Sequence, residues 1–216
     1  SSILPNLYNY ILEQSKNFSK EALNRHAATM RMRGRPKVVL ARTYEEAQKL
    51  YDKYSDNTLG VISDARFPLK SAAKAFGNEV MPEEKPKHRT DTFGREKCPD
   101  AGLQLFRYIR KNDPFVPLII ESSESENRAK AEAEGFRFVD KNSKKMSVDL
   151  RRLMEEHMGF GDFIFRDPKT HEEIMRIHSL KELQDNIFNI PNDSMLYHIS
   201  RNHMSRWLCA RAIFPV

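Results

Sequence analysis

Short apolar runs alternate along this chain with amphipathic stretches, and the alternation predicts strands and helices in turn. Four almost continuously apolar runs predict strands, at 37–41 (KVVLA), 58–63 (TLGVIS), 116–122 (VPLIIES) and 136–141 (FRFVDK). Helical spacing or strong helix formers predict helices at 101–112, 126–135 and 147–159. Because strands that are apolar throughout are usually buried on both faces, this order predicts βα units around a parallel sheet.

The N-terminal part is predicted to be helical over residues 2–33, with a break near Ser15–Ser19. Thr43 and Glu46 have the spacing of a capping box and predict the start of a further helix. The helices of this part therefore precede the first two strands of the expected sheet.

The last part of the chain, 159–216, differs in pattern from residues 1–158, and we expect two domains with this boundary. Two strands around the turn DPKTHE predict a hairpin. Ser179 is placed to cap a following helix, and a final helix is expected to begin at Asp193 or Ser194. This part therefore reads as a small α+β appendage.

Composition narrows the class of protein. Of the 216 residues, 39% are hydrophobic and 31% are charged, and no run is long and apolar enough to span a membrane. The two cysteines, Cys98 and Cys209, are far apart, which suits a cytoplasmic location. The net charge of +6 is concentrated near 31–37, where a solvated loop is favoured over a phosphate-binding patch. We therefore expect neither nucleic acid nor membrane as a partner.

The tail's histidines and tryptophan are interpreted as structural. His198 and His203 are five residues apart, a poor spacing for metal ligands on a helix. Trp207 is expected to pack with Leu196, Ile199 and Leu208 in a core or at an interface between domains.

An acid, a hydroxyl and a lysine follow successive strands of the expected sheet. Asp64 follows the run at 58–63, Ser122 and Ser123 end the next, and Asp140 and Lys141 end the last. Because the carboxyl ends of parallel strands meet at one edge, these side chains are expected to converge there. A carboxylate can act as nucleophile, while a hydroxyl and a lysine can bind phosphoryl oxygens, so the trio predicts a phosphorylation site.

These motifs resemble the receiver domain of two-component response regulators. ISDARFP matches its phosphoacceptor strand, VPLIIESS its switch strand and FVDKNS its lysine strand. The resemblance covers about residues 1–158 and implies a flavodoxin-like fold with three layers, α/β/α. It also implies Mg²⁺-dependent phosphorylation of Asp64, a switch through Ser122, charge pairing by Lys141, and the backbone carbonyl of Arg66 as a metal ligand.

Three departures from the receiver pattern stand out. The first strand of a receiver, which ends in an acidic pair that holds the Mg²⁺, has no counterpart here, so we expect the chain to be a fragment of a longer one. Residues 69–100 form an insertion that is expected to be mobile. Asn142 stands where receivers usually have proline.

A narrower resemblance is carried by GFGDFIFRDP, SLKEL and IPNDSMLYHISRNHMSRWL. These phrases are similar to the N-terminal regulatory region of bacterial multidomain proteins of the phosphoenolpyruvate synthase or pyruvate phosphate dikinase type. The parent chain would then be an ATP-dependent phosphotransferase, and this part of it would not itself be an enzyme. The implied partners are the downstream domains, a sensor kinase and, through the incomplete sheet, a second copy of the chain.

Rival functions differ in the residues they require. A DNA-binding regulator needs a basic output domain, and the tail is neutral in charge. A hydrolase with an aspartate nucleophile usually needs an acid two residues later, where this chain has Arg66. A pseudo-receiver, which keeps the fold but serves only for docking or dimerisation, stays open as an alternative.

Overall fold

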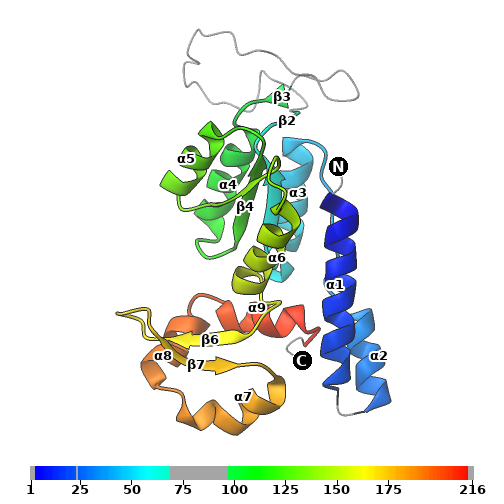
Figure 1. Cartoon of the computed structure of the whole chain (residues 1–216), viewed down its shortest axis with the longest axis vertical. Coiled ribbons are helices and arrows are strands. Elements are labelled where there is room, and N and C mark those ends of the chain that lie inside the picture. The colour runs from blue at the N-terminus through cyan, green and yellow to red at the C-terminus, as the bar shows by residue number, and fades with distance from the viewer. Residues whose placement is uncertain (1–2, 23, 69–96, 214–216) are drawn as a thin grey trace. The chain divides into compact units, whose positions relative to one another are not determined.

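A computed structural model describes residues 3–22, 24–68 and 97–213 (Figure 1). The chain divides into two compact units, residues 39–146 and residues 1–38 with 147–216. This division differs from the expected boundary after residue 158, because the N-terminal helices cluster with the tail. Most of the expected insertion, residues 69–96, lies outside the described residues.

The unit 39–146 contains a three-stranded parallel sheet in the order β1-β4-β5. Its strands are β1 (Val61–Asp64), β4 (Leu118–Ser122) and β5 (Arg137–Asp140). All five residues of the central strand β4 are buried, as the continuously apolar run predicts. The parallel α/β arrangement expected from the sequence is therefore confirmed for these three strands.

Helices and a short antiparallel pair of strands complete this unit. They are α3 (Tyr44–Tyr54), the 3₁₀ turn η1 (Ser55–Asn57), α4 (Ala101–Asn112), α5 (Glu126–Ala133), and the antiparallel pair β2 (Phe67–Pro68) and β3 (Lys97–Cys98). The predicted capping box opens α3, since Thr43 accepts from the Glu46 amide and Glu46 accepts from the Arg42 amide.

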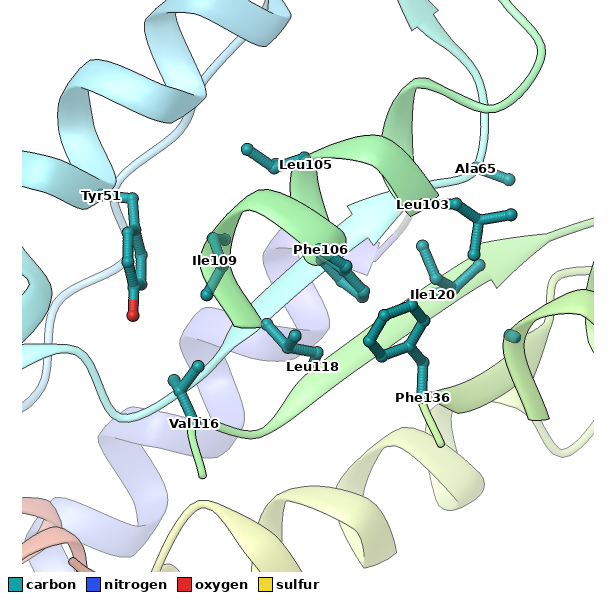
Figure 2. Close-up of a cluster of buried hydrophobic side chains, with 11 residues drawn as sticks. Tyr51, Ala65, Leu103, Leu105, Phe106, Ile109, Val116, Leu118, Ile120 and Phe136 are labelled. Atoms are coloured by element: carbon teal, nitrogen blue, oxygen red, sulfur yellow. The ribbon is translucent and has the colours of Figure 1, made fainter. Parts of the chain in front are cut away.

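The core of this unit lies between α4 and the sheet (Figure 2). Phe106 is fully buried and packs edge to face against Phe136, with ring centroids 5.3 Å apart. Leu118 and Ile120 face the same cluster from β4. Burial of each such side chain contributes about 1.5–3 kcal/mol, so this packing holds the strand ends in fixed positions.

The predicted strand at 37–41 is wrong. The segment is irregular, and Val39 and Leu40 are 59% and 52% exposed. A β-branched run forms a strand only where a neighbouring strand pairs with it, and no strand in the described part of the chain pairs with this segment. β1 is accordingly an edge strand of the described sheet.

The other unit combines helices from both ends of the chain with one hairpin. Its helices are α1 (Ile3–Lys20), α2 (Arg25–Arg33), nearly all of α6 (Met146–His157), α7 (Leu180–Asn186), the 3₁₀ turn η2 (Ile187–Asn189), α8 (Asn192–Ile199) and α9 (His203–Ala210). The predicted hairpin is confirmed as β6 (Phe163–Arg166) paired antiparallel with β7 (Glu173–Ile177). The break between α1 and α2 falls at residues 21–24, later than predicted.

The predicted single helix at the end of the chain is wrong, because it is interrupted between α8 and α9. Asn202 adopts a left-handed conformation with φ of 57°, which a continuous α-helix does not allow. Trp207 of α9 is buried in the core of this unit, and its indole N–H donates to the Gly161 carbonyl at 2.9 Å. The expected structural role of Trp207 is therefore confirmed, whereas Leu196 and Ile199 are exposed.

Candidate functional site at the sheet edge

The predicted trio lies at the carboxyl edge of the parallel sheet. Asp64 and Ser122 are the last residues of β1 and β4, and Lys141 directly follows β5. The strand register pairs Asp64 with Glu121, and Glu121 with Val139. Because side chains alternate between the faces of a strand, Asp64, Glu121 and Lys141 belong to the same face.

The structure brings Asp64 and Lys141 into direct contact. The Lys141 ammonium forms an ion pair with Oδ1 of Asp64, and the two side chains are 30% and 50% exposed. Burial lowers the pKa of Lys141 from its ordinary value, since a desolvated ammonium is less stable. Two residues 77 positions apart in sequence therefore meet at the surface, as the strand-end argument predicts.

Ser122 lies at the same edge, but its hydroxyl serves its own loop. Its Oγ accepts from the Glu124 amide at 3.1 Å and from Nδ2 of Asn127 at 2.8 Å. Its carbonyl accepts from the Lys141 amide at 3.0 Å. The residue thus fixes the start of α5 and the position of Lys141.

The loop after β1 is held tightly. The Ala65 amide donates to the Glu121 carbonyl, and the Gly102 amide donates to the Ala65 carbonyl, both at 3.0 Å. A Cβ on Gly102 would lie 2.3 Å from the Asp64 carbonyl oxygen, so this close approach requires glycine. The start of α4 therefore sets the position of the phosphoacceptor candidate.

Arg66 has a side-chain role that sequence reasoning missed. Its guanidinium donates through Nε and Nη2 to Oε2 of Glu124, at 3.1 and 2.7 Å. This pair joins the loop after β1 to the loop after β4. Arg66 still lies two residues beyond Asp64, where its backbone carbonyl is the expected metal ligand.

Asn142, which departs from the receiver pattern, links two loops of the edge. Its amide N–H donates to Oδ1 of Asp140 at 2.8 Å, and its Nδ2 donates to the Ser123 carbonyl at 2.9 Å. Asparagine therefore fixes the turn after β5 with side-chain hydrogen bonds, which a proline could not make.

Glu121 is a further charged residue at this edge, and sequence reasoning missed it. It is 6% exposed, and its Oε2 lies 3.9 Å from the Lys141 ammonium. Burial raises the pKa of its carboxyl to about 7, because desolvation disfavours the charged form. A signal was present in the sequence, since Glu121 is an acid inside the otherwise apolar run VPLIIES.

Glu121 and Asp64 together suit a divalent cation better than Asp64 alone. No set of three or more His, Cys, Asp or Glu side chains with metal-binding geometry occurs in the described part of the chain. Oε1 of Glu121, however, is buried without a hydrogen-bond partner among the described residues. An orphaned buried carboxylate oxygen next to Asp64 fits Mg²⁺, which binds through one or two carboxylates and retains waters.

The tail's histidines form a pair that their sequence spacing did not predict. The break at Asn202 places Nδ1 of His198 3.0 Å from Nδ1 of His203. Nε2 of His198 accepts the Arg166 amide at 3.0 Å. Since a ring nitrogen that accepts carries no proton, neutral His198 is protonated at Nδ1 and donates to His203. This is a structural pair in the hairpin unit, at a distance in sequence from the sheet-edge residues.

Comparison of the chain with protein-family models, with curated proteins and with solved structures gives no significant match. No helix among the described residues is long and apolar enough to cross a bilayer. Both cysteines are free thiols.

Proposed function

We propose that the unit 39–146 is a receiver-like regulatory module in which Asp64 accepts a phosphoryl group. The single observation that carries the proposal is the Asp64–Lys141 ion pair at the carboxyl edge of three parallel strands. The same proposal includes a flavodoxin-like fold and a cytoplasmic location. It also includes a parent protein of the phosphoenolpyruvate synthase type. Its partners would be further domains of that parent and a sensor kinase.

The chemistry follows from the two charged side chains. A carboxylate oxygen of Asp64 attacks the phosphorus of the donor, and the bond between phosphorus and the donor's leaving group breaks, with its electron pair leaving on the donor. The product is an acyl phosphate on Asp64. Lys141, already in contact with that carboxylate, would pair with the phosphoryl oxygens. Mg²⁺, when bound, would neutralise phosphoryl charge as the new bond forms.

A conformational signal would then pass through the loops at this edge. Ser122 would rotate so that its hydroxyl donates to a phosphoryl oxygen, and it would give up the bonds that it accepts from Glu124 and Asn127. The Lys141 amide is bonded to the Ser122 carbonyl, so a shift of one loop displaces the other. In phosphorylation switches, a local change of charge usually alters the packing of neighbouring segments in this way.

A second function, a pseudo-receiver for docking or dimerisation, is favoured by a different observation. Arg66 and Glu124 already cross-link two loops of the edge without phosphate. The Ser122 hydroxyl oxygen also accepts two hydrogen bonds within its own loop. An edge that is ordered in this way can present a fixed surface to a protein partner.

Phosphorylation by a small phosphodonor with Mg²⁺, followed by intact mass, separates the two functions. We expect the chain to gain the mass of one phosphoryl group and Asp64→Asn to gain none. Asp140→Asn is the matched control, because Asp140 lies at the same edge and asparagine keeps the oxygen that accepts from Asn142. If the chain stays unmodified, or if Asp64→Asn is modified to the same extent, Asp64 is not the phosphoacceptor. The docking function is then the better account of this unit.

A further inference from the structure

Glu121 occupies the centre of the charged edge. It belongs to β4, the middle strand, and its neighbours in register are Asp64 on one side and Val139 on the other. Lys141 lies two residues beyond Val139, so its side chain is on the same face of the sheet as Glu121. A carboxylate is therefore built into the middle strand, between the two residues of the proposed phosphorylation site.

The surroundings of Glu121 are unusual for a carboxylate. The residue is 6% exposed, and its Oε1 is buried without a hydrogen-bond partner in the described residues. Burying a carboxylate is unfavourable unless a proton or a cation compensates its charge. Desolvation raises the pKa of Glu121 to about 7, so both kinds of compensation are available near neutral pH.

A positive charge already lies between the two carboxylates. The Lys141 ammonium contacts Asp64 and lies 3.9 Å from Oε2 of Glu121. Two carboxylates share one ammonium, which leaves an excess of negative charge when both are ionised. The Lys141 side chain is 30% exposed, so it can turn outward into solvent.

We propose that Glu121 and Asp64 are the side-chain ligands of a divalent-cation site of the Mg²⁺ type, in which the cation takes the place of the Lys141 ammonium. Two carboxylates with waters and a backbone oxygen form a sufficient ligand set for this ion. Glu121 would thus supply a carboxylate ligand that, in receiver domains, comes from the acidic pair after the first strand. The use of the ion rests on the proposed function, but its binding can be measured without phosphorylation.

Direct titration with Mn²⁺, read by the electron paramagnetic resonance of the unbound ion, tests the site. The full chain is used at about pH 8, above the pKa of Glu121, because ligands must be deprotonated. We expect one Mn²⁺ per chain, displaced by Mg²⁺, and at least ~10-fold weaker binding for Glu121→Gln and Asp64→Asn. Glu126→Gln, the same change on an exposed residue of the same unit, should bind like the unmodified chain.

Lys141→Met provides a test of opposite sign. Removing the competing ammonium should tighten Mn²⁺ binding if the cation takes its place, and this variant keeps Glu121 in case Glu121→Gln does not fold. Circular dichroism checks the fold of each variant. Unchanged binding by folded Glu121→Gln, unchanged or weaker binding by Lys141→Met, or no binding by the unmodified chain would overturn the inference.

The two proposals fail in distinguishable ways. Binding of Mn²⁺ that depends on Glu121, without phosphate on Asp64, would refute the proposed function and keep the cation site. Phosphorylation of Asp64 that is unaffected by Glu121→Gln, together with unchanged Mn²⁺ binding, would refute the cation site and keep the proposed function.

Discussion

Arg211 shows how one residue can organise the end of a chain. It is 2% exposed, and its guanidinium stacks on the Trp207 ring at 3.7 Å. It donates to the carbonyls of Gly159, Gly161 and Trp207 at 2.8–3.1 Å. Burial lowers the pKa of Arg211 to about 10, yet the group remains charged at neutral pH. Its planar fork therefore joins two carbonyls of the loop after α6 to one carbonyl of α9.

Arg211→Lys should destabilise the protein by about 2–4 kcal/mol although it keeps the charge, because an ammonium can neither stack nor reach three carbonyls in a plane. Urea unfolding measures the difference in free energy. The matched control is Arg152→Lys at an exposed position of α6, where we expect a change within ~0.5 kcal/mol. Equal effects at the two positions would contradict the role assigned to Arg211.

The candidate site was predictable where it depends on strand order and not where it depends on burial. Asp64 and Lys141 end apolar runs, so parallel topology alone predicts that they meet. The role of Glu121 depends on desolvation and on an unpaired oxygen, which arise only once β4 is packed. The side-chain bonds of Ser122 likewise depend on where Asn127 lies after α5 forms.

At the scale of elements, local signals predicted those elements whose determinants are local. The helix at 101–112 was predicted with its observed ends, because its apolar spacing and its flanking residues agree. Ser179 caps α7 as expected, accepting from the Glu182 amide. The strand at 37–41 failed because pairing is not a local property. The long final helix failed because Asn202 takes a left-handed conformation that composition alone does not reveal.

Two glycines that follow helices should respond differently to the same substitution. Gly135 and Gly159 both have positive φ, of 74° and 82°. A Cβ on Gly135 would meet open space, whereas one on Gly159 would lie 2.8 Å from the Arg206 carbonyl oxygen and from the Trp207 Cα. Gly135→Ala therefore bears only the backbone term, about 1–2 kcal/mol. Gly159→Ala must also displace α9, and we expect a loss of about 3 kcal/mol or more.

Thermal unfolding of the two glycine variants, measured side by side, checks this difference. Both glycines have a positive φ, so any greater loss of stability in Gly159→Ala is due to the close approach of α9. A Gly159→Ala variant as stable as Gly135→Ala would show that the turn can move away from α9 without loss.

At the scale of the whole molecule, the two units carry different chemistry. The unit 39–146 contains the charged sheet edge, while the unit of residues 1–38 and 147–216 contains the histidine pair. Burial lowers the pKa of both His198 and His203 to about 4, and neighbouring cations add to the effect. The charges that act on His198 come from Arg166 and Arg201. Those that act on His203 come from Arg206 and Arg201, and from His198 and His157 when these rings are protonated.

Acid should therefore selectively lower the stability of the unit of residues 1–38 and 147–216. The ordinary pKa of 6.5 applies to the unfolded chain, so between about pH 6.5 and 4 the unfolded state binds more protons than the folded one. Stability from the neutral pair is complete above 6.5 and is lost as the pH falls through this window. Protonated His198 would also lose the bond from the Arg166 amide, because Nε2 could no longer accept.

Hydrogen exchange followed by mass spectrometry can locate the effect. After correction for the intrinsic pH dependence of exchange, amides of β6 should open about 10-fold or more between about pH 7.5 and 5. Amides of β4 in the same sample serve as the internal reference for the other unit. His203→Asn removes one titrating ring and should reduce the acid response of β6. Equal acid sensitivity of the variant and the unmodified chain would place the response outside the histidine pair.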